Sequence, residues 1–142
     1  MITECRSSTT QRYRADSALF RVLAHSGWTT TKGGTRRPSS IAFYEARGEV
    51  SYFVDVPGML AELSRIFPGS EIARVPARVV RAVGFAIERR PTECPEDFRC
   101  DRACHVVAGP PAELTRLEFQ GKARNIAKDP GVTIVRPEST AR

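Results

Sequence analysis

Four residues spread along the chain carry side chains suited to acid–base or group-transfer chemistry. His25 and His105 are the only two histidines among 142 residues, and histidine is the side chain whose charge changes near neutral pH. Ser40 supplies a hydroxyl that can act as a nucleophile or positioning group, and Arg21 supplies a guanidinium that binds anions. If the four converge, they form a catalytic pocket for a nucleotide or another phosphorylated or acyl substrate. Taken alone, His105 lies in an apolar run, where a buried histidine with one satisfied hydrogen bond is the alternative.

A second group of reactive side chains lies late in the chain and consists of Cys94, Cys100, Cys104 and His105. Three thiolates and one imidazole are a donor set that suits zinc. The C-x5-C-x3-C-H spacing lacks the C-x2-C knuckle of structural zinc sites, and adjacent residues of a strand point to opposite faces. We therefore favour cysteines with no metal role over a zinc site, with a redox-sensing thiol beside Arg99 and Arg102 as a third alternative. No cofactor is expected.

Basic residues are concentrated at the start of the chain. The formal net charge is +6, and residues 1–37 hold seven basic residues against two acidic ones, whereas residues 38–142 are almost balanced. Lys32, Arg36 and Arg37 flank two glycines, and such a loop offers backbone amides and cations to a phosphate. The G-x-x-x-x-G-K-[ST] motif of P-loops is absent. The sequence therefore predicts an anion-binding loop, with a solvated glycine turn as the alternative.

The elements that must position these residues indicate an α+β fold. Period-two alternation and turn residues predict short strands, and Pro57, Pro76 and Pro111 each suit the first turn of a helix. We expect one mixed sheet of about six short strands with two or three helices, and a turn-rich loop over 26–38. The expected strands lie at 18–23, 41–44, 50–56, 70–75, 85–89, 103–108 and 132–135, with 41–44 and 50–56 paired as a hairpin.

The last expected helix is apolar on two sides. Ala112, Phe119 and Ala123 lie on one side, while Leu114 and Leu117 lie on nearly the opposite side. A helix of this kind is either buried between two layers or offers its second side to a partner. The Leu114 and Leu117 face is thus a candidate surface for a protein partner.

Length and composition point to one domain. The 142 residues are 41% apolar and 27% charged, which is ordinary for a globular chain of this size. We expect a disordered or loosely attached basic arm over 1–16, a single domain over 17–136 and a tail over 137–142. No apolar run approaches the roughly 20 residues of a membrane span. The absence of an export signal and of a disulfide framework predicts a cytoplasmic protein.

Several short motifs resemble those of a family of small, uncharacterised bacterial proteins. The resemblance covers about residues 18–109, and the chain departs from the family pattern at Ser26, where the family has proline. It implies that Arg21, His25, Ser40, Phe43, Ser51 and His105 are functional positions, but it supplies no activity. The motifs are Phe20-Arg21 with His25, the run 38–43 (Pro-Ser-Ser-Ile-Ala-Phe), Val50-Ser51, and the run 103–109 from Ala103 through His105 to Gly109.

Two functions follow as expectations. The first is a bacterial accessory or binding protein whose basic arm and loop engage nucleic acid or an acidic partner, for example within a defence or toxin–antitoxin operon. The alternative is a small transferase or hydrolase that uses the Arg21, His25, Ser40 and His105 set.

Overall fold

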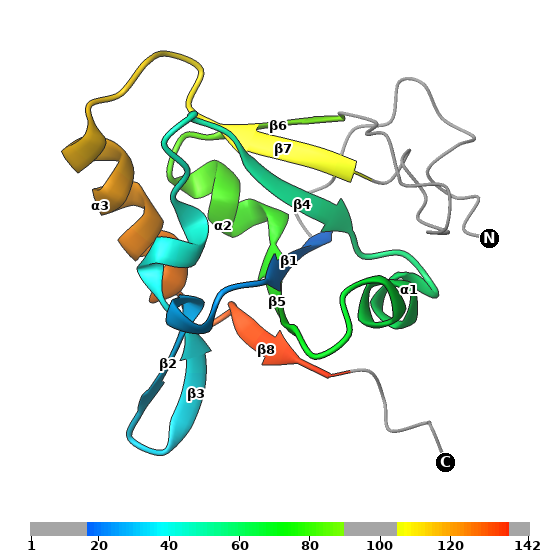
Figure 1. Cartoon of the computed structure of the whole chain (residues 1–142). Coiled ribbons are helices and arrows are strands. Elements are labelled where there is room, and N and C mark those ends of the chain that lie inside the picture. Colours follow the sequence, from blue (N-terminus) through cyan, green and yellow to red (C-terminus); the bar gives the residue numbers. More distant parts are fainter. Residues whose placement is uncertain (1–16, 90–104, 137–142) are drawn as a thin grey trace.

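A six-stranded sheet with the order β6-β7-β4-β1-β5-β8 forms the centre of the molecule (Figure 1). The computed structural model describes residues 17–89 and 105–136. The α+β class and the single domain expected from the sequence are confirmed, but every pairing in the sheet is antiparallel rather than mixed. The strands are β1 (Ala18–Leu23), β4 (Val50–Val54), β5 (Glu71–Pro76), β6 (Ala86–Arg89), β7 (His105–Gly109) and β8 (Thr133–Val135).

Helices cover both faces of this sheet. The helices are α1 (Met59–Ile66), α2 (Ala77–Ala82) and α3 (Arg116–Ala127). The crossovers β4-α1-β5 and β5-α2-β6 run in opposite directions along the sheet, so the right-handed rule places α1 and α2 on opposite faces. Figure 1 shows α1 on one side, and α2 and α3 on the other. As a result, all six residues of the central strand β1 are buried.

No helix in the described ranges has the length and apolar composition needed to cross a membrane.

The segment expected to be a loop over 26–38 contains a second, two-stranded sheet. After a 3-10 turn, η1 (Ser26–Trp28), strand β2 (Thr29–Lys32) pairs with β3 (Thr35–Pro38). Gly33 and Gly34 make the turn with φ values of 57° and 81°. Positive φ at both central residues is typical of the tight hairpin turn that matches strand twist. The loop prediction was wrong because the threonines of β2 are polar, so the apolar alternation that predicts a strand is absent there.

The expected strand at 41–44 is also wrong. This segment is a 3-10 turn, η2 (Ser40–Phe43), and the adjacent residues Ala42 and Phe43 are both buried. Its backbone makes i→i+3 hydrogen bonds, from the Ala42 amide to the Ser39 carbonyl and from the Tyr44 amide to the Ile41 carbonyl, in place of strand pairing. Its predicted partner β4 pairs instead with β1 and β7.

Helix α3 begins later than Pro111. Thr115 is its N-cap, and the Thr115 hydroxyl accepts a hydrogen bond from the Glu118 amide while the Glu118 carboxylate accepts one from the Thr115 amide. This reciprocal capping box satisfies two amides at the start of the helix, where amides have no intrahelical partner. The residues between Gly109 and Thr115 therefore form a loop.

Candidate functional site

Arg21 is buried within the fold, with an exposed fraction of 6%. Its Nε donates a hydrogen bond to the Ala42 carbonyl (2.8 Å) and its Nη1 to the Ser51 carbonyl (3.1 Å). Its Nη2 donates to the Glu45 carboxylate at 3.1 Å. The guanidinium also lies 4.5 Å from the centre of the Trp28 ring, in cation–π geometry. Arg21 thus ties β1 to β4 and η2, and an anion would have to displace Glu45 to bind it.

His25 and Ser40 lie in the same region as Arg21. The exposed His25 packs edge-on against the Trp28 ring, with 4.6 Å between ring centres. Ser40 begins η2, the turn that holds the Arg21 partner Ala42. The structure therefore brings three of the four candidate catalytic residues to one end of β1.

His105 lies on the opposite face of the sheet. It pairs with Phe53, which in turn pairs with Phe20, so His105 shares a face with Phe20. Because successive strand residues alternate, Arg21 points to the other face. His105 is buried at 6% exposure, and its ring packs against that of Phe53 with 5.3 Å between centres. The sheet itself separates His105 from Arg21.

Tyr52 is a buried polar residue that sequence reasoning missed. Its hydroxyl has no hydrogen-bond partner among the described residues. Burial raises the pKa of the Tyr52 phenol, and the positive charge of Arg21 opposes this rise. The position lies in an apolar alternation, so no sequence signal distinguished it from the core residues beside it.

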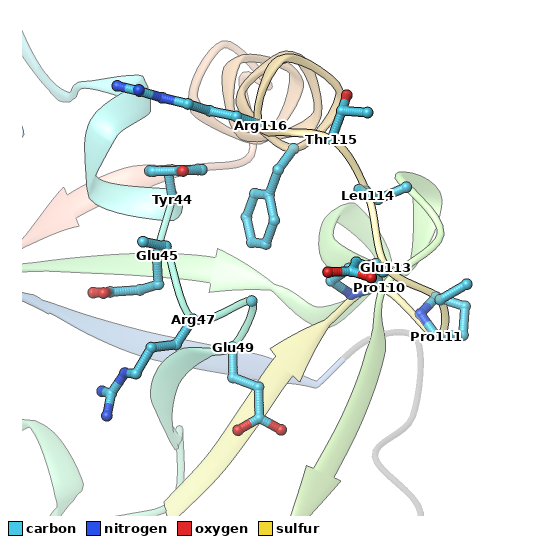
Figure 2. Close-up of a pocket in the computed structure, with 14 residues that line it drawn as sticks. Tyr44, Glu45, Arg47, Glu49, Pro110, Pro111, Glu113, Leu114, Thr115 and Arg116 are labelled. Atoms are coloured by element: carbon cyan, nitrogen blue, oxygen red, sulfur yellow. The ribbon is translucent and has the colours of Figure 1, made fainter.

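A cleft of about 460 Å³ lies between the loop after η2 and the loop that leads into α3. None of Arg21, His25, Ser40 and His105 lines it. Figure 2 shows the side chains of Arg47 and Arg116 extending in different directions rather than converging on one point. Acidic, basic and apolar side chains are mixed around it, and its lining includes Tyr44, Glu45, Arg47, Glu49, Pro110, Glu113, Leu114, Arg116 and Phe119.

Two of the three predicted anion-binding residues have partners within the fold. The Arg36 Nε lies 2.9 Å and 2.7 Å from the two carboxylate oxygens of Glu71, and this hydrogen bond lowers the pKa of the Glu71 carboxyl. Arg37 donates to the carbonyls of Ala127 (2.8 Å) and Asp129 (2.9 Å). It therefore caps the negative C-terminal end of α3. Lys32 remains exposed at the hairpin tip.

The candidate metal ligands fall largely outside the described residues. Cys94, Cys100 and Cys104 lie there, and His105 alone is described. Within residues 17–89 and 105–136, no group of three or more His, Cys, Asp or Glu side chains is arranged to hold a metal ion.

Leu114 and Leu117 do not form one helix face. Leu114 precedes α3 and packs, half-buried, against the core, whereas Leu117 is 78% exposed on the first turn. The shared face required both residues to be helical, and the capping box at Thr115 leaves Leu114 in the loop. The candidate partner surface is reduced to Leu117.

Basic side chains gather where the hairpin, the end of α3 and β8 meet, which we call the basic end. Arg36 binds the Glu71 carboxylate, and the charge of Arg136 also acts on Glu71. Arg37 donates hydrogen bonds to the carbonyls of the residues on both sides of Lys128. The six basic and two acidic residues give it a formal net charge of +4. The set is Lys32, Arg36, Arg37, Arg124, Lys128 and Arg136, with Glu71 and Asp129.

The cations of the basic end differ in their availability. Lys32, Arg124 and Lys128 are exposed, and their side chains make no hydrogen bond or ion pair with other described residues. The two carboxylates are engaged, since Glu71 binds Arg36 and Asp129 accepts a hydrogen bond from the Gly131 amide at 2.8 Å. Sequence reasoning missed Arg124 and Lys128, because cations in the last turn of a helix are typical of dipole stabilisation.

Comparison of the chain with protein-family models, with curated proteins and with solved structures finds no match.

Proposed function

We propose that this protein is a binding protein that engages a polyanionic partner, nucleic acid or an acidic protein, through its basic end. The observation that carries the proposal is the net charge of +4 gathered there, with three exposed cations that have no partner among the described residues. Cations in this state are available to phosphates or carboxylates at little cost. The basic arm expected over residues 1–16 lies outside the described residues.

The enzyme alternative has weaker support. Arg21 is engaged by Glu45 and two backbone carbonyls, and His105 lies across the sheet from it. A general base must come within hydrogen-bond reach of the proton that it removes, directly or through one water. Catalysis by this set would therefore have to use His25 and Ser40 without His105, and we favour the binding function.

Fluorescence anisotropy with labelled double-stranded DNA and with polyglutamate tests the proposal. For phosphate contacts, log K should fall linearly with log salt concentration with a slope of about −0.9 per contact. The variant Lys32→Gln/Arg124→Gln/Lys128→Gln should lose most of the binding to whichever probe binds. Replacing Arg6, Arg12 and Arg14 by glutamine measures the share of the N-terminal segment.

The control is Arg47→Gln, because Arg47 is exposed but lies at the cleft, near the other end of α3. It should bind as the unaltered protein does. Absence of binding to both probes at about 50 mM salt, where electrostatic binding is strong, would refute the proposal, as would a triple variant with unchanged affinity.

A further inference from the structure

The β2–β3 hairpin is a slender projection from the body of the molecule (Figure 1). Three residue steps separate the Thr29–Pro38 pair at its base from the Lys32–Thr35 pair at its tip. At about 3.4 Å per residue, this ribbon is about 10 Å long. Residues 31–36 are all exposed. The Gly33-Gly34 turn carries no side chains, so the tip is narrow.

The face of the ribbon that carries Lys32 is the face turned toward α3. Alternation along β2 and β3 places Lys32 on the same side as Arg37, because the Lys32–Thr35 and Thr30–Arg37 pairs are two steps apart. Arg37 reaches the carbonyls on both sides of Lys128. The face of the ribbon that carries Lys32 is therefore turned toward the end of α3, the helix that carries the exposed cations Arg124 and Lys128.

Among the described residues, no aromatic side chain is fully open to single-stranded bases. Each described tryptophan, tyrosine and phenylalanine side chain is buried or only partly exposed, and the exposed large apolar residues are Ile41 and Leu117. Proteins that bind single strands without sequence preference combine a basic groove with exposed aromatic rings. The exposed tip of the hairpin carries threonine hydroxyls instead of aromatic rings, with Thr31 and Thr35 beside Lys32.

We infer that the partner is double-stranded B-form DNA, with the β2–β3 hairpin in its major groove and with Arg124 and Lys128 on the flanking phosphates. That groove is about 12 Å wide and about 8.5 Å deep and admits a two-stranded ribbon, and the exposed part of this ribbon is its tip, residues 31–36. The major groove of A-form RNA is too narrow for side chains to read. Exposed threonine and lysine side chains suit contacts to base edges and phosphates. This inference rests on the proposed function and names the partner of the basic end.

A competition experiment with the full chain tests the inference. The probes are one sequence of about two helical turns as duplex DNA, as single-stranded DNA and as duplex RNA, together with polyglutamate. Duplex DNA should bind on the order of tenfold or more tighter than the other three at equal salt, since the expected contacts specific to its groove add to the electrostatic term. Equal affinity for all four would overturn the inference and leave the proposed function standing. No binding to any probe would refute the proposed function itself.

Groove occupancy gives a second readout. Guanine N7 lies in the major groove, so the protein should protect it from methylation by dimethyl sulfate, and a minor-groove ligand should not displace the protein. Unprotected N7, or displacement by the minor-groove ligand, would overturn the inference.

Variants of Lys32 distinguish the effect of its positive charge on DNA binding from the effect of its side-chain shape. Lys32→Ala should reduce the salt slope for duplex DNA by about 1, and Lys32→Arg should restore it. Arg47→Ala is the matched control and should leave the slope unchanged. A Lys32→Ala protein that retains both the slope and the N7 protection would contradict the assigned contact.

Discussion

Arg21 was expected to bind an anion, but its contacts in the structure are those of a structural residue. Its guanidinium binds two backbone carbonyls and the Glu45 carboxylate, and it stacks on Trp28. An arginine that binds a substrate anion must keep some of its guanidinium N–H groups free for that anion. The contacts of Arg21 join strands β1 and β4 to η2, so its main role in this fold is to hold that turn against the sheet.

This role predicts a loss of stability on substitution. Arg21→Met removes three hydrogen bonds, leaves two carbonyls and one carboxylate without their donor, and should lower the free energy of unfolding by about 3 kcal/mol. Chemical denaturation monitored by circular dichroism measures the change. Arg47→Met is the matched control, because Arg47 is exposed, and it should change the stability by no more than about 0.5 kcal/mol. Equal stability of the two variants would show that Arg21 is not a structural residue.

At the scale of elements, the two walls of the cleft meet where two backbones touch. A Cβ added to Gly109, at the end of β7, would lie 2.2 Å from the Gly48 carbonyl oxygen. Gly48 belongs to the loop after η2, which forms one wall, and the loop into α3 that follows Gly109 forms the other. The absence of a side chain at position 109 therefore sets how closely the two loops approach.

Alanine substitutions at two glycines should have opposite effects. Gly109→Ala forces a backbone shift and should destabilise the fold by about 2 kcal/mol or more. Gly121→Ala adds a methyl group inside α3, where its nearest neighbour is the Arg124 guanidinium at 3.7 Å, and should stabilise the protein by about 1 kcal/mol through helix propensity. Thermal unfolding of both variants measures the pair. A neutral Gly109→Ala variant would mean that the two loops separate freely.

At the scale of the whole molecule, charges are distributed unevenly although most of the chain is balanced in composition. Residues 38–142 hold nearly equal numbers of basic and acidic residues. The fold nevertheless collects a net +4 at the basic end, because it brings Lys32, Arg36 and Arg37 of the basic first segment beside Arg124, Lys128 and Arg136. In the cleft, Glu45, Glu49 and Glu113 are mixed with Arg47 and Arg116. Long-range attraction of a polyanion depends on such local concentrations of charge rather than on the total. The electrostatic character of the protein is thus a property of its topology.

The ion pair between Arg36 and Glu71 ties stability to pH. Because Arg36 lowers the pKa of the Glu71 carboxyl, the ionised carboxylate is favoured in the folded state. Its stabilisation is present above the unfolded carboxyl pKa of about 4.3 and is lost as the pH falls through the lower folded pKa. Glu71→Gln should therefore be less stable than the unaltered protein at pH 7, and the difference should shrink below about pH 4.3.

Urea denaturation from neutral to acidic pH measures this difference. Arg36→Gln serves as the control, since it removes the main cause of the shift and should also lose stability at neutral pH, together with the Arg36 hydrogen bond to the Thr29 hydroxyl. A difference that stays constant with pH in either comparison would exclude the ion pair as its source.

The class of the fold and most of its elements follow from local signals. Apolar alternation predicts β4, short apolar runs predict β1, β5 and β8, and prolines and glycines mark the limits of α1 and α2. These signals extend over only a few residues, so they can be recognised without knowing which distant segments pack together. They fail at η2, where Ala42 and Phe43 are both buried against partners far along the chain.

The sites were decided by tertiary structure. Alternation within a strand tells which of its residues share a face, but only the pairing of Phe20, Phe53 and His105 across three strands places His105 away from Arg21. In the same way, the loop sequence shows that Arg36 and Arg37 are basic, but their partners Glu71 and Ala127 lie 35 and 90 residues away. A residue type determines which chemistry is available. Contacts between distant segments determine whether that chemistry is used inside the fold or remains available to a partner.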